Sequence, residues 1–223
     1  MSIPLPPTAI AALLTACRKE HDTASPSPDT APPPLSITDF SQLDSGNYWG
    51  YDRHRVDPMD VADPNFHRRD RLFIAGDTVL DGHTWSVVRQ ASDGVVSNAI
   101  EYWRDPAEFL LGRSGEVLFS SANLGQVIGV DSIPAPSTVA IRYSVSPAPV
   151  PVSVPAGTFQ SYVMTGTCYS YGGFPVIPAW KYPRTHWVEG IGRVKWCACF
   201  AMGTTGYRYQ LVDYHVQRPG RGC

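Results

Sequence analysis

The stretch that decides the fold is residues 192–200, which read GRVKWCACF. Alternate positions share their character, since the even ones are apolar and the odd ones are basic or cysteine. The even set is Val194, Trp196, Ala198 and Phe200, and the odd set is Arg193, Lys195, Cys197 and Cys199. A period of two is typical of a strand with one buried face. We therefore predict a strand here, with its even positions facing the core.

Two neighbouring segments extend this prediction. Residues 157–169 and 207–216 are rich in the β-branched and aromatic residues that favour strands. If neighbours in sequence pair as hairpins, the three segments form a three-strand meander.

The rest of the chain from residue 36 alternates short apolar runs with turn signals. Asp81-Gly82 predicts a tight hairpin turn, and Gly115 predicts a second one after Arg113-Ser114. The prolines of 147–155 lack ladder donors, which restricts that passage to an edge or a loop. We expect an all-β or mainly β fold of about ten strands, as an antiparallel curved sheet, half-barrel or barrel-like, with one short helical segment near 38–43.

Composition limits the classes of function. The chain has 223 residues, of which 43% are hydrophobic and 17% charged, so it can bury a sizeable core. A net charge of -2 provides no basic surplus to replace the counterions of a phosphate backbone, and we expect no nucleic-acid partner. These values favour a single β-rich domain over residues 37–219, with a short tail at 220–223.

The N-terminal residues 1–16 read MSIPLPPTAIAALLTA and suit a signal peptide. The apolar run at 9–14 is too short to span a bilayer as a helix. The following Leu14-Thr15-Ala16-Cys17 resembles the lipobox of bacterial lipoproteins, which implies cleavage before Cys17 and lipid attachment to its sulfur. The leader departs from the pattern because it has no Lys or Arg before Cys17. The alternative is a frayed terminus with an incidental cysteine.

Residues 17–36 follow as a proline- and serine-rich segment with few apolar side chains. Such a segment cannot offset its ordering entropy, so we expect a disordered tether between the lipidated Cys17 and the domain. Arg18 follows the cysteine instead of Asp, which by resemblance to the enterobacterial sorting rule implies the outer membrane. The residues leave open whether the domain faces the periplasm or the cell surface.

Four further stretches resemble a group of uncharacterised Bacteroidetes-type envelope lipoproteins. They are GNYW at 46–49, AGDTVLDG at 75–82, VPAGTF at 154–159 and EGIGRVK at 189–195. The resemblance implies a curved antiparallel sheet or half-barrel of the lipoprotein-carrier sort. It implies no activity, no cofactor and no catalytic residue.

Metal and disulfide chemistry receive little support from spacing. The six histidines do not follow a known ligand spacing, so we expect no metal site. Cys197 and Cys199 share one strand face and offer half of a zinc site, while disulfides or free thiols are the favoured alternatives. If the meander forms, Cys168 lies level with the residues before Cys223, and this pair is one of three connectivities that remain open.

No catalytic pattern stands out. Ser114, before Gly115, lies in a plain turn instead of a nucleophile elbow, and Asp57, Asp60, Asp63 and Asp70 are interleaved with basic residues as in a solvated loop. We therefore expect a non-enzymatic protein without a cofactor.

The aromatic residues point instead to binding. Most of the tryptophans are expected in the core, whereas Trp180 and Tyr182 lie in an expected loop and are candidate contact residues. The sequence favours a membrane-anchored binding or carrier module for a small apolar ligand or an envelope protein. A structural or assembly role in an envelope complex is the alternative.

Overall fold

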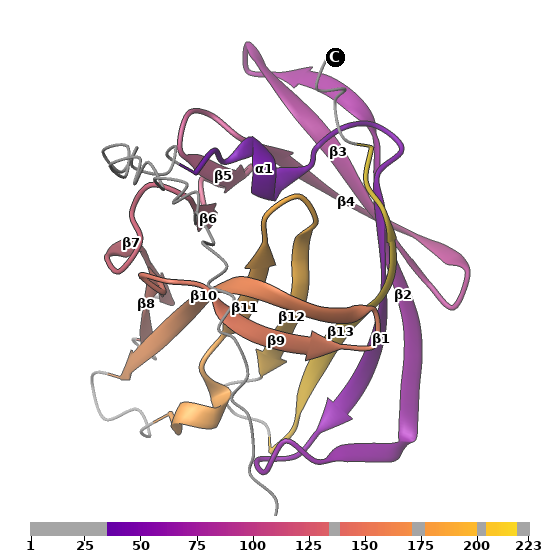
Figure 1. The fold of residues 1–223 in the computed structure, drawn as a ribbon, viewed down its shortest axis with the longest axis vertical. Helices are drawn as coiled ribbons and strands as arrows, with labels where there is room; N and C mark the ends of the chain where they lie inside the picture. The colour runs from indigo at the N-terminus through magenta and orange to yellow at the C-terminus, as the bar shows by residue number, and fades with distance from the viewer. Residues whose placement is uncertain (1–34, 134–138, 171–176, 200–203, 218–223) are drawn as a thin grey trace, which may run out of the picture. The chain divides into compact units, whose positions relative to one another are not determined.

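The computed structural model describes residues 35–133, 139–170, 177–199 and 204–217. The expected signal peptide, Cys17, most of the tether and the 220–223 tail lie outside these ranges. In the described residues almost all regular structure is β (Figure 1). The first eight elements are α1 (Thr38–Ser41), β1 (Tyr48–Val56), β2 (Ala62–Leu80), β3 (His83–Ser92), β4 (Val95–Arg104), β5 (Phe109–Gly112), β6 (Val117–Ser120) and β7 (Val127–Ile133). The remaining ones are β8 (Val139–Val145), β9 (Val150–Val154), β10 (Gly157–Ser170), the 3-10 turn η1 (Ala179–Lys181), β11 (Arg184–Val188), β12 (Gly192–Cys199) and β13 (Gly206–His215).

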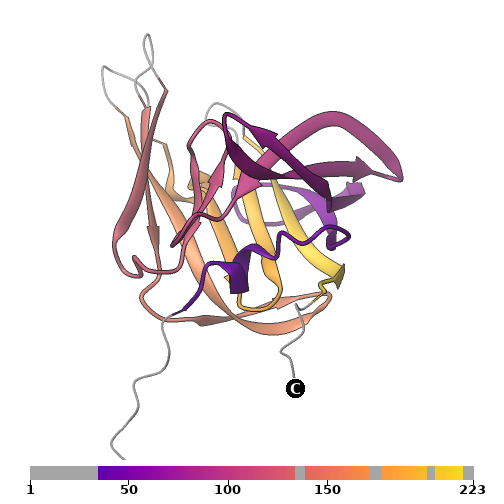
Figure 2. The same ribbon diagram turned by 90° about the horizontal axis from the view of Figure 1, so that it is seen from above.

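The strands form one antiparallel sheet that curls into a nearly closed barrel (Figure 2). Its order is β6-β5-β4-β3-β2-β1-β13-β12-β11-β10-β8-β7, with β9 paired to β10 outside this path. The two end strands approach each other, because a side-chain carbon added at Gly129 in β7 would lie 3.7 Å from the Cβ of Val117 in β6. This confirms the predicted all-β, barrel-like fold.

Local turn signals predicted the hairpins correctly. Asp81 and Gly82 connect β2 to β3 with φ angles of 53° and 75°, the left-handed pair that a tight two-residue hairpin requires. Gly115, with φ of 86°, lies in the turn between β5 and β6. The proline-containing β9 is an edge strand, as a segment short of ladder donors should be.

The predicted C-terminal meander was wrong in one respect. The strand Arg184–Val188 (β11), which the sequence reading overlooked, lies between β10 and β12, so the meander has four strands. It is only 5 residues long and follows a proline-containing segment, so it lacks the long alternation that marks the other strands. With other short pairings it raises the total to thirteen strands in the described residues, instead of about ten.

The predicted faces of β12 need correction at Ala198, which is exposed instead of buried, and at Arg193, while Phe200 lies outside the described residues. Val194 is fully buried and the Trp196 ring packs on the core, as expected. Arg193, however, was assigned to the outer face, and its guanidinium carbon lies 4.0 Å from the ring centroid of Trp196 and 5.4 Å from that of the buried Trp103. The cause is a β-bulge, because the register with β11 shifts between His186 and Trp187.

Large aromatic side chains fill the part of the barrel next to α1. The ring centroids of Phe40 and Phe119 lie 4.8 Å apart, and those of Phe119 and Trp187 lie 5.2 Å apart. Phe40 comes from α1, which crosses one end of the curled sheet (Figure 2). The short helix expected near 38–43 is therefore present and carries a core residue.

The inner face of the sheet also carries an ion pair between a half-buried arginine and a buried carboxylate. Arg53 in β1 and Asp70 in β2 point into the barrel, with the Arg53 Nε and an Asp70 carboxylate oxygen 3.2 Å apart. Ser92 donates a further hydrogen bond of 2.6 Å to Asp70. The segment between Val56 and Arg71, expected as a solvated loop, is mostly the first half of β2, whose charges are held in ion pairs across neighbouring strands.

Candidate binding cleft on the outer face

A cleft of about 230 Å³ opens on the outer face of the barrel, where β11, β12 and β13 meet η1 and the β1–β2 turn. Its lining combines aromatic, basic and acidic side chains. The residues are Val56, Asp57, Pro58, Asp60, Ala179, Trp180, Tyr182, Arg184, His186, Lys195, Trp196, Cys197 and Arg208.

Both predicted contact residues lie in this cleft. Trp180 belongs to η1 and Tyr182 follows it, and each is half-buried. The Tyr182 hydroxyl is 3.4 Å from the Cys168 carbonyl oxygen, to which it donates, and Lys181 Nζ is 5.2 Å from the Trp180 ring centroid. The expected loop is thus a short turn that is tied to the barrel wall. The other tryptophans behave as predicted, since Trp49, Trp85, Trp103 and Trp187 are buried in the core.

Strand pairing brings basic side chains together on the opposite wall. Arg184, Cys197 and Arg208 are paired in register across β11, β12 and β13, so they form one row on the outer face. Lys195 is two positions from Cys197 and therefore on the same face. The Arg208 guanidinium makes an ion pair of 2.8 Å with Asp60. Sequence reasoning missed this basic wall, because its members are distant in sequence and only the register aligns them.

His186 stands at the inner side of the cleft. Its Nδ1 lies 3.0 Å from the hydroxyl oxygen of the buried Ser161, and that hydroxyl donates to the Val150 carbonyl oxygen at 3.1 Å. Burial, with the nearby charges of Lys195 and Arg184, lowers the pKa of His186 to about 4. When the Ser161 proton goes to the Val150 carbonyl oxygen, the Ser161 oxygen accepts from the Nδ1–H tautomer of His186.

The cysteines do not follow the geometry assumed from sequence. Cys168 pairs with Ile141 of β8, and two strands separate β10 from β13, so the register argument for its proximity to Cys223 was wrong. Cys223 lies outside the described residues, and the Cys168–Cys223 bond stays a prediction. Burial raises the pKa of the Cys168 thiol. The side chain of Cys199 is also outside the described part, so the half zinc site with Cys197 stays untested.

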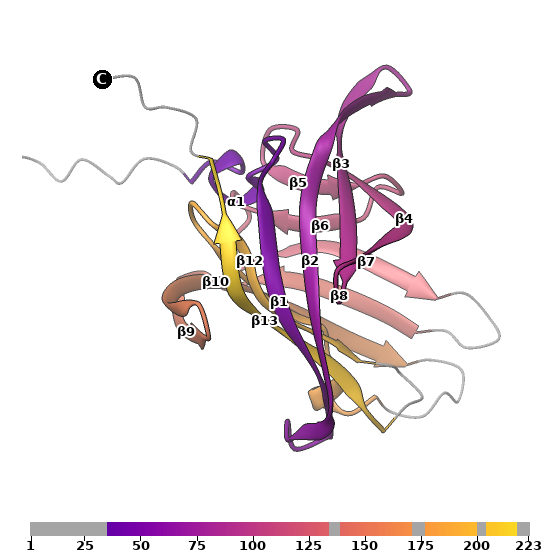
Figure 3. The ribbon, with the colours of Figure 1, turned by 90° about the vertical axis from the view of Figure 1, so that its right-hand side faces the viewer.

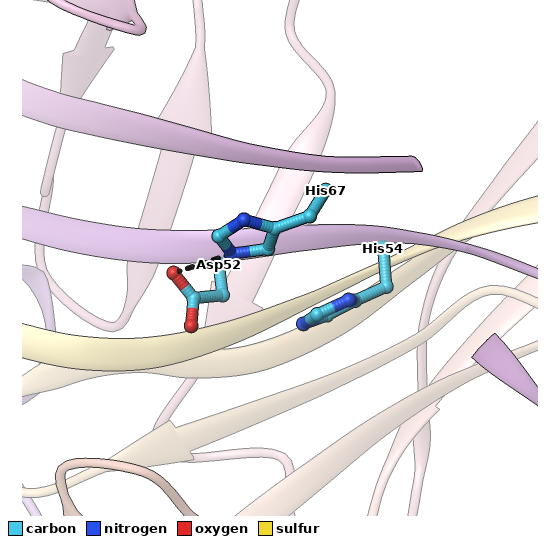
Figure 4. Close-up of side chains that lie close together, drawn as sticks. All are labelled: Asp52, His54 and His67. Carbon is cyan, nitrogen blue, oxygen red and sulfur yellow. Dashed lines mark ion pairs between the residues drawn. The ribbon is translucent and has the colours of Figure 1, made fainter. Parts of the chain in front are cut away.

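Strands β1 and β2 run side by side (Figure 3) and carry a second group of polar side chains (Figure 4), next to the cleft because His54 is the Cα partner of Arg208. It consists of Asp52, His54 and His67, whose metal-binding atoms all lie within 4.8 Å of one another. His67 Nε2 is 3.1 Å from the Asp52 carboxylate. Burial, followed by His67 and Arg208, holds the pKa of His54 below its usual range.

Sequence spacing did not predict this group. His54 and His67 are 13 positions apart and become Cα partners only when β1 pairs with β2. The available signal was the Asp52-x-His54 alternation, which puts two ligand types on one strand face.

Comparisons with known proteins give two structural similarities. No protein-family model matches the sequence, and a search of the curated proteins finds no match. One similar structure is a protein of Bacteroides fragilis NCTC 9343, proposed to be exported and described with a YmcC-like fold. It is 11% identical with a TM-score of 0.42, covering 77% of this chain and 96% of its own. The other, a proposed lipoprotein of Parabacteroides distasonis ATCC 8503, is 12% identical with a TM-score of 0.42, covering 79% of this chain and 98% of its own. Neither similarity assigns a role to a residue of the cleft.

Proposed function

We propose that this protein is a membrane-anchored extracytoplasmic lipoprotein whose β domain binds a small ligand without changing it chemically. The observation that carries the binding proposal is the outer cleft, where Trp180 and Tyr182 face the basic side chains of β11, β12 and β13. Concave sites with aromatic walls and a few convergent polar groups are the usual form of small-ligand sites.

The lining indicates the chemistry of the ligand. Aromatic side chains bind rings and apolar surfaces, while Arg184 and Lys195 suit an acidic group. Arg208 is already paired with Asp60, so it contributes less charge. We therefore propose a small ring compound with an acidic group. This is more polar than the apolar ligand expected from sequence, because the basic wall appears only after strand pairing.

The cleft is favoured over the barrel interior as the ligand site. Carriers with a barrel fold often enclose their ligand between the strands. Here the part of the interior next to α1 is occupied by Phe40, Phe119 and Trp187, whose rings contact one another. Placing the ligand there would require these side chains to move.

The anchoring part of the proposal rests on the sequence Leu14-Thr15-Ala16-Cys17. An acylated Cys17 with the tether of residues 17–36 would hold the domain away from the membrane, at up to roughly 3 Å per residue of extended chain. Arg18 after the cysteine supports the outer membrane as the address. In the described residues, no helix has the length and apolarity needed to cross a bilayer.

Native mass spectrometry of the protein isolated gently from its own envelope tests both parts. We expect a chain that begins at Cys17 and carries acyl groups, together with one non-covalent small molecule. Trp180→Ala and Arg184→Ala should each lose that small molecule. Arg113→Ala, which removes an arginine packed on Tyr102 at a distance from the cleft, should retain it.

This experiment tests the membrane anchor and the ligand-binding cleft independently of each other. An unacylated chain beginning at Met1 would overturn the anchor. A bound small molecule that persists in both cleft variants, or its absence from the wild-type protein, would overturn the assignment of the cleft.

One observation favours the assembly role as a second candidate. β4 exposes three large apolar side chains, with 72% of Val95, 47% of Val96 and 43% of Ile100 accessible. Exposed apolar patches mark interaction surfaces. In the same spectra, a second protein chain that is lost in Ile100→Asp but kept in Trp180→Ala would support this role instead.

A further inference from the structure

We propose that the outer face of β1 and β2 carries a binding site for a divalent first-row transition-metal ion, built from Asp52, His54 and His67. The three side chains point toward one another in Figure 4. This inference is independent of the ligand proposed for the cleft.

Strand pairing brings the three donors together. Asp52 and His54 are two residues apart on β1 and therefore share its outer face. His67 is the Cα partner of His54 on β2, and the two imidazole centroids lie 5.0 Å apart. At the site β1 is paired on both sides, with β13 and with β2, whereas β2 pairs with β3 only from Asp70 onward, so the backbone of His67 is held by β1 alone.

The distances are close to those of a metal site. A metal with nitrogen and oxygen ligands at about 2.0–2.2 Å brings any two donors to roughly 3–4 Å from each other. The donors here are within 4.8 Å, and His67 Nε2 is already 3.1 Å from Asp52. The His67 side chain is 54% exposed, so it is free to rotate toward a bound ion.

The donor set selects the class of metal. Two imidazoles and one carboxylate suit zinc, copper, nickel or iron, whereas calcium and magnesium prefer oxygen ligands alone. Three protein donors leave further coordination positions for water or an exogenous ligand. Sites made of nitrogen and oxygen ligands generally bind copper(II) more tightly than zinc, and we expect the same here.

The surrounding charges permit a cation. Arg69 donates to Asp52 at 2.9 Å and to Asp213 at 3.0 Å, so it orients the carboxylate while its own charge is shared with a second one. Arg208, the other nearby cation, is paired with Asp60. The two carboxylates and Arg69 together leave one net negative charge beside two histidines.

Calorimetric titration of tag-free, chelator-treated protein with zinc chloride and with copper sulfate tests the site. We expect one ion per chain, with tighter binding of copper(II). His67→Gln and Asp52→Asn should each weaken binding by about tenfold or more, because each removes a ligand. His83→Gln removes an exposed histidine at the β2–β3 turn and should leave binding unchanged.

Electron paramagnetic resonance of the copper-loaded protein distinguishes this site from adventitious surface binding. Two coordinated imidazoles should give nitrogen hyperfine splitting that His67→Gln reduces to one nitrogen. Circular dichroism should show that the variants remain folded, as expected for an exposed position. The proposal is overturned if neither metal binds at millimolar concentration, if the variants bind as the wild type does, or if the copper signal lacks nitrogen splitting.

Discussion

The burial of His186 should make the stability of the folded protein depend on pH. It lies between Ser161 on β10, Lys195 on β12 and Arg184 on its own strand. Desolvation and the two positive charges both oppose protonation, which lowers its pKa from the usual 6.5 to about 4. The folded protein therefore keeps a neutral imidazole where the unfolded chain would take up a proton.

Stability should consequently fall as the pH is lowered from about 6.5 toward 4, because only the unfolded state gains a proton there. His186 is partly exposed, so we expect a loss of about 1–2 kcal/mol, less than the full shift implies. Urea unfolding at several pH values should show this loss in the wild type and less of it in His186→Gln. His83→Gln serves as the control, and equal pH dependence in all three proteins would contradict the prediction.

At the scale of elements, the start of β12 depends on one glycine. Gly192 has φ of +101°, and a side-chain carbon added there would lie 3.2 Å from the Phe40 carbonyl oxygen and 3.4 Å from Trp49 Nε1. Trp49 in turn donates a hydrogen bond of 2.6 Å to Ile191. The turn before β12, α1 and β1 therefore meet at a point where only glycine fits.

Gly192→Ala should lower the free energy of unfolding by about 2–3 kcal/mol, because it adds both backbone strain and a close contact. Gly82→Ala is the matched comparison, since Gly82 has φ of +75° but nothing within 4 Å of the added carbon. It should cost about 1 kcal/mol from strain alone. Denaturant titration of both variants measures the difference in the free energy of unfolding. Equal losses would contradict the prediction, because they would mean that the neighbouring atoms move away from the added carbon at no cost.

At the scale of the whole molecule, the barrel is held unevenly around its circumference. β1 and β13 have hydrogen-bonded neighbours on both sides, whereas β6 and β7 end the strand order. β6 and β7 approach through side chains such as Val117 beside Gly129. Separating β6 from β7 would therefore break none of the strand pairings of this sheet.

Hydrogen exchange followed by mass spectrometry should therefore show a gradient around the barrel. Amides of β6 and β7 should exchange at least about tenfold faster than those of β1 and β13, because their opening exposes less buried structure. Uniform protection of all four strands would mean that the seam is closed by hydrogen bonds in solution.

Local patterns explain what was predictable in this protein. The Asp81-Gly82 turn, the edge position of the prolines in β9 and the buried position of Val194 in β12 each depend on a few neighbouring residues. Strand β11 was missed because it is short, and the inward position of Arg193 was missed because a bulge interrupts the alternation on which the prediction depended. The contact role of Trp180 and Tyr182 remains a prediction, although the structure brings both into the cleft.

The sequence by itself determined the β class, the hairpin turns and the short helix near the start of the domain, while the lipobox resemblance of Leu14-Thr15-Ala16-Cys17 stays a prediction. Only the tertiary structure decided which side chains meet. β1 pairs with β13 from the opposite end of the domain, and this places His54 beside Arg208 at the border between the Asp52–His54–His67 group and the cleft. Such pairings are selected by closure of the whole sheet around its core, and no local pattern of residues specifies them.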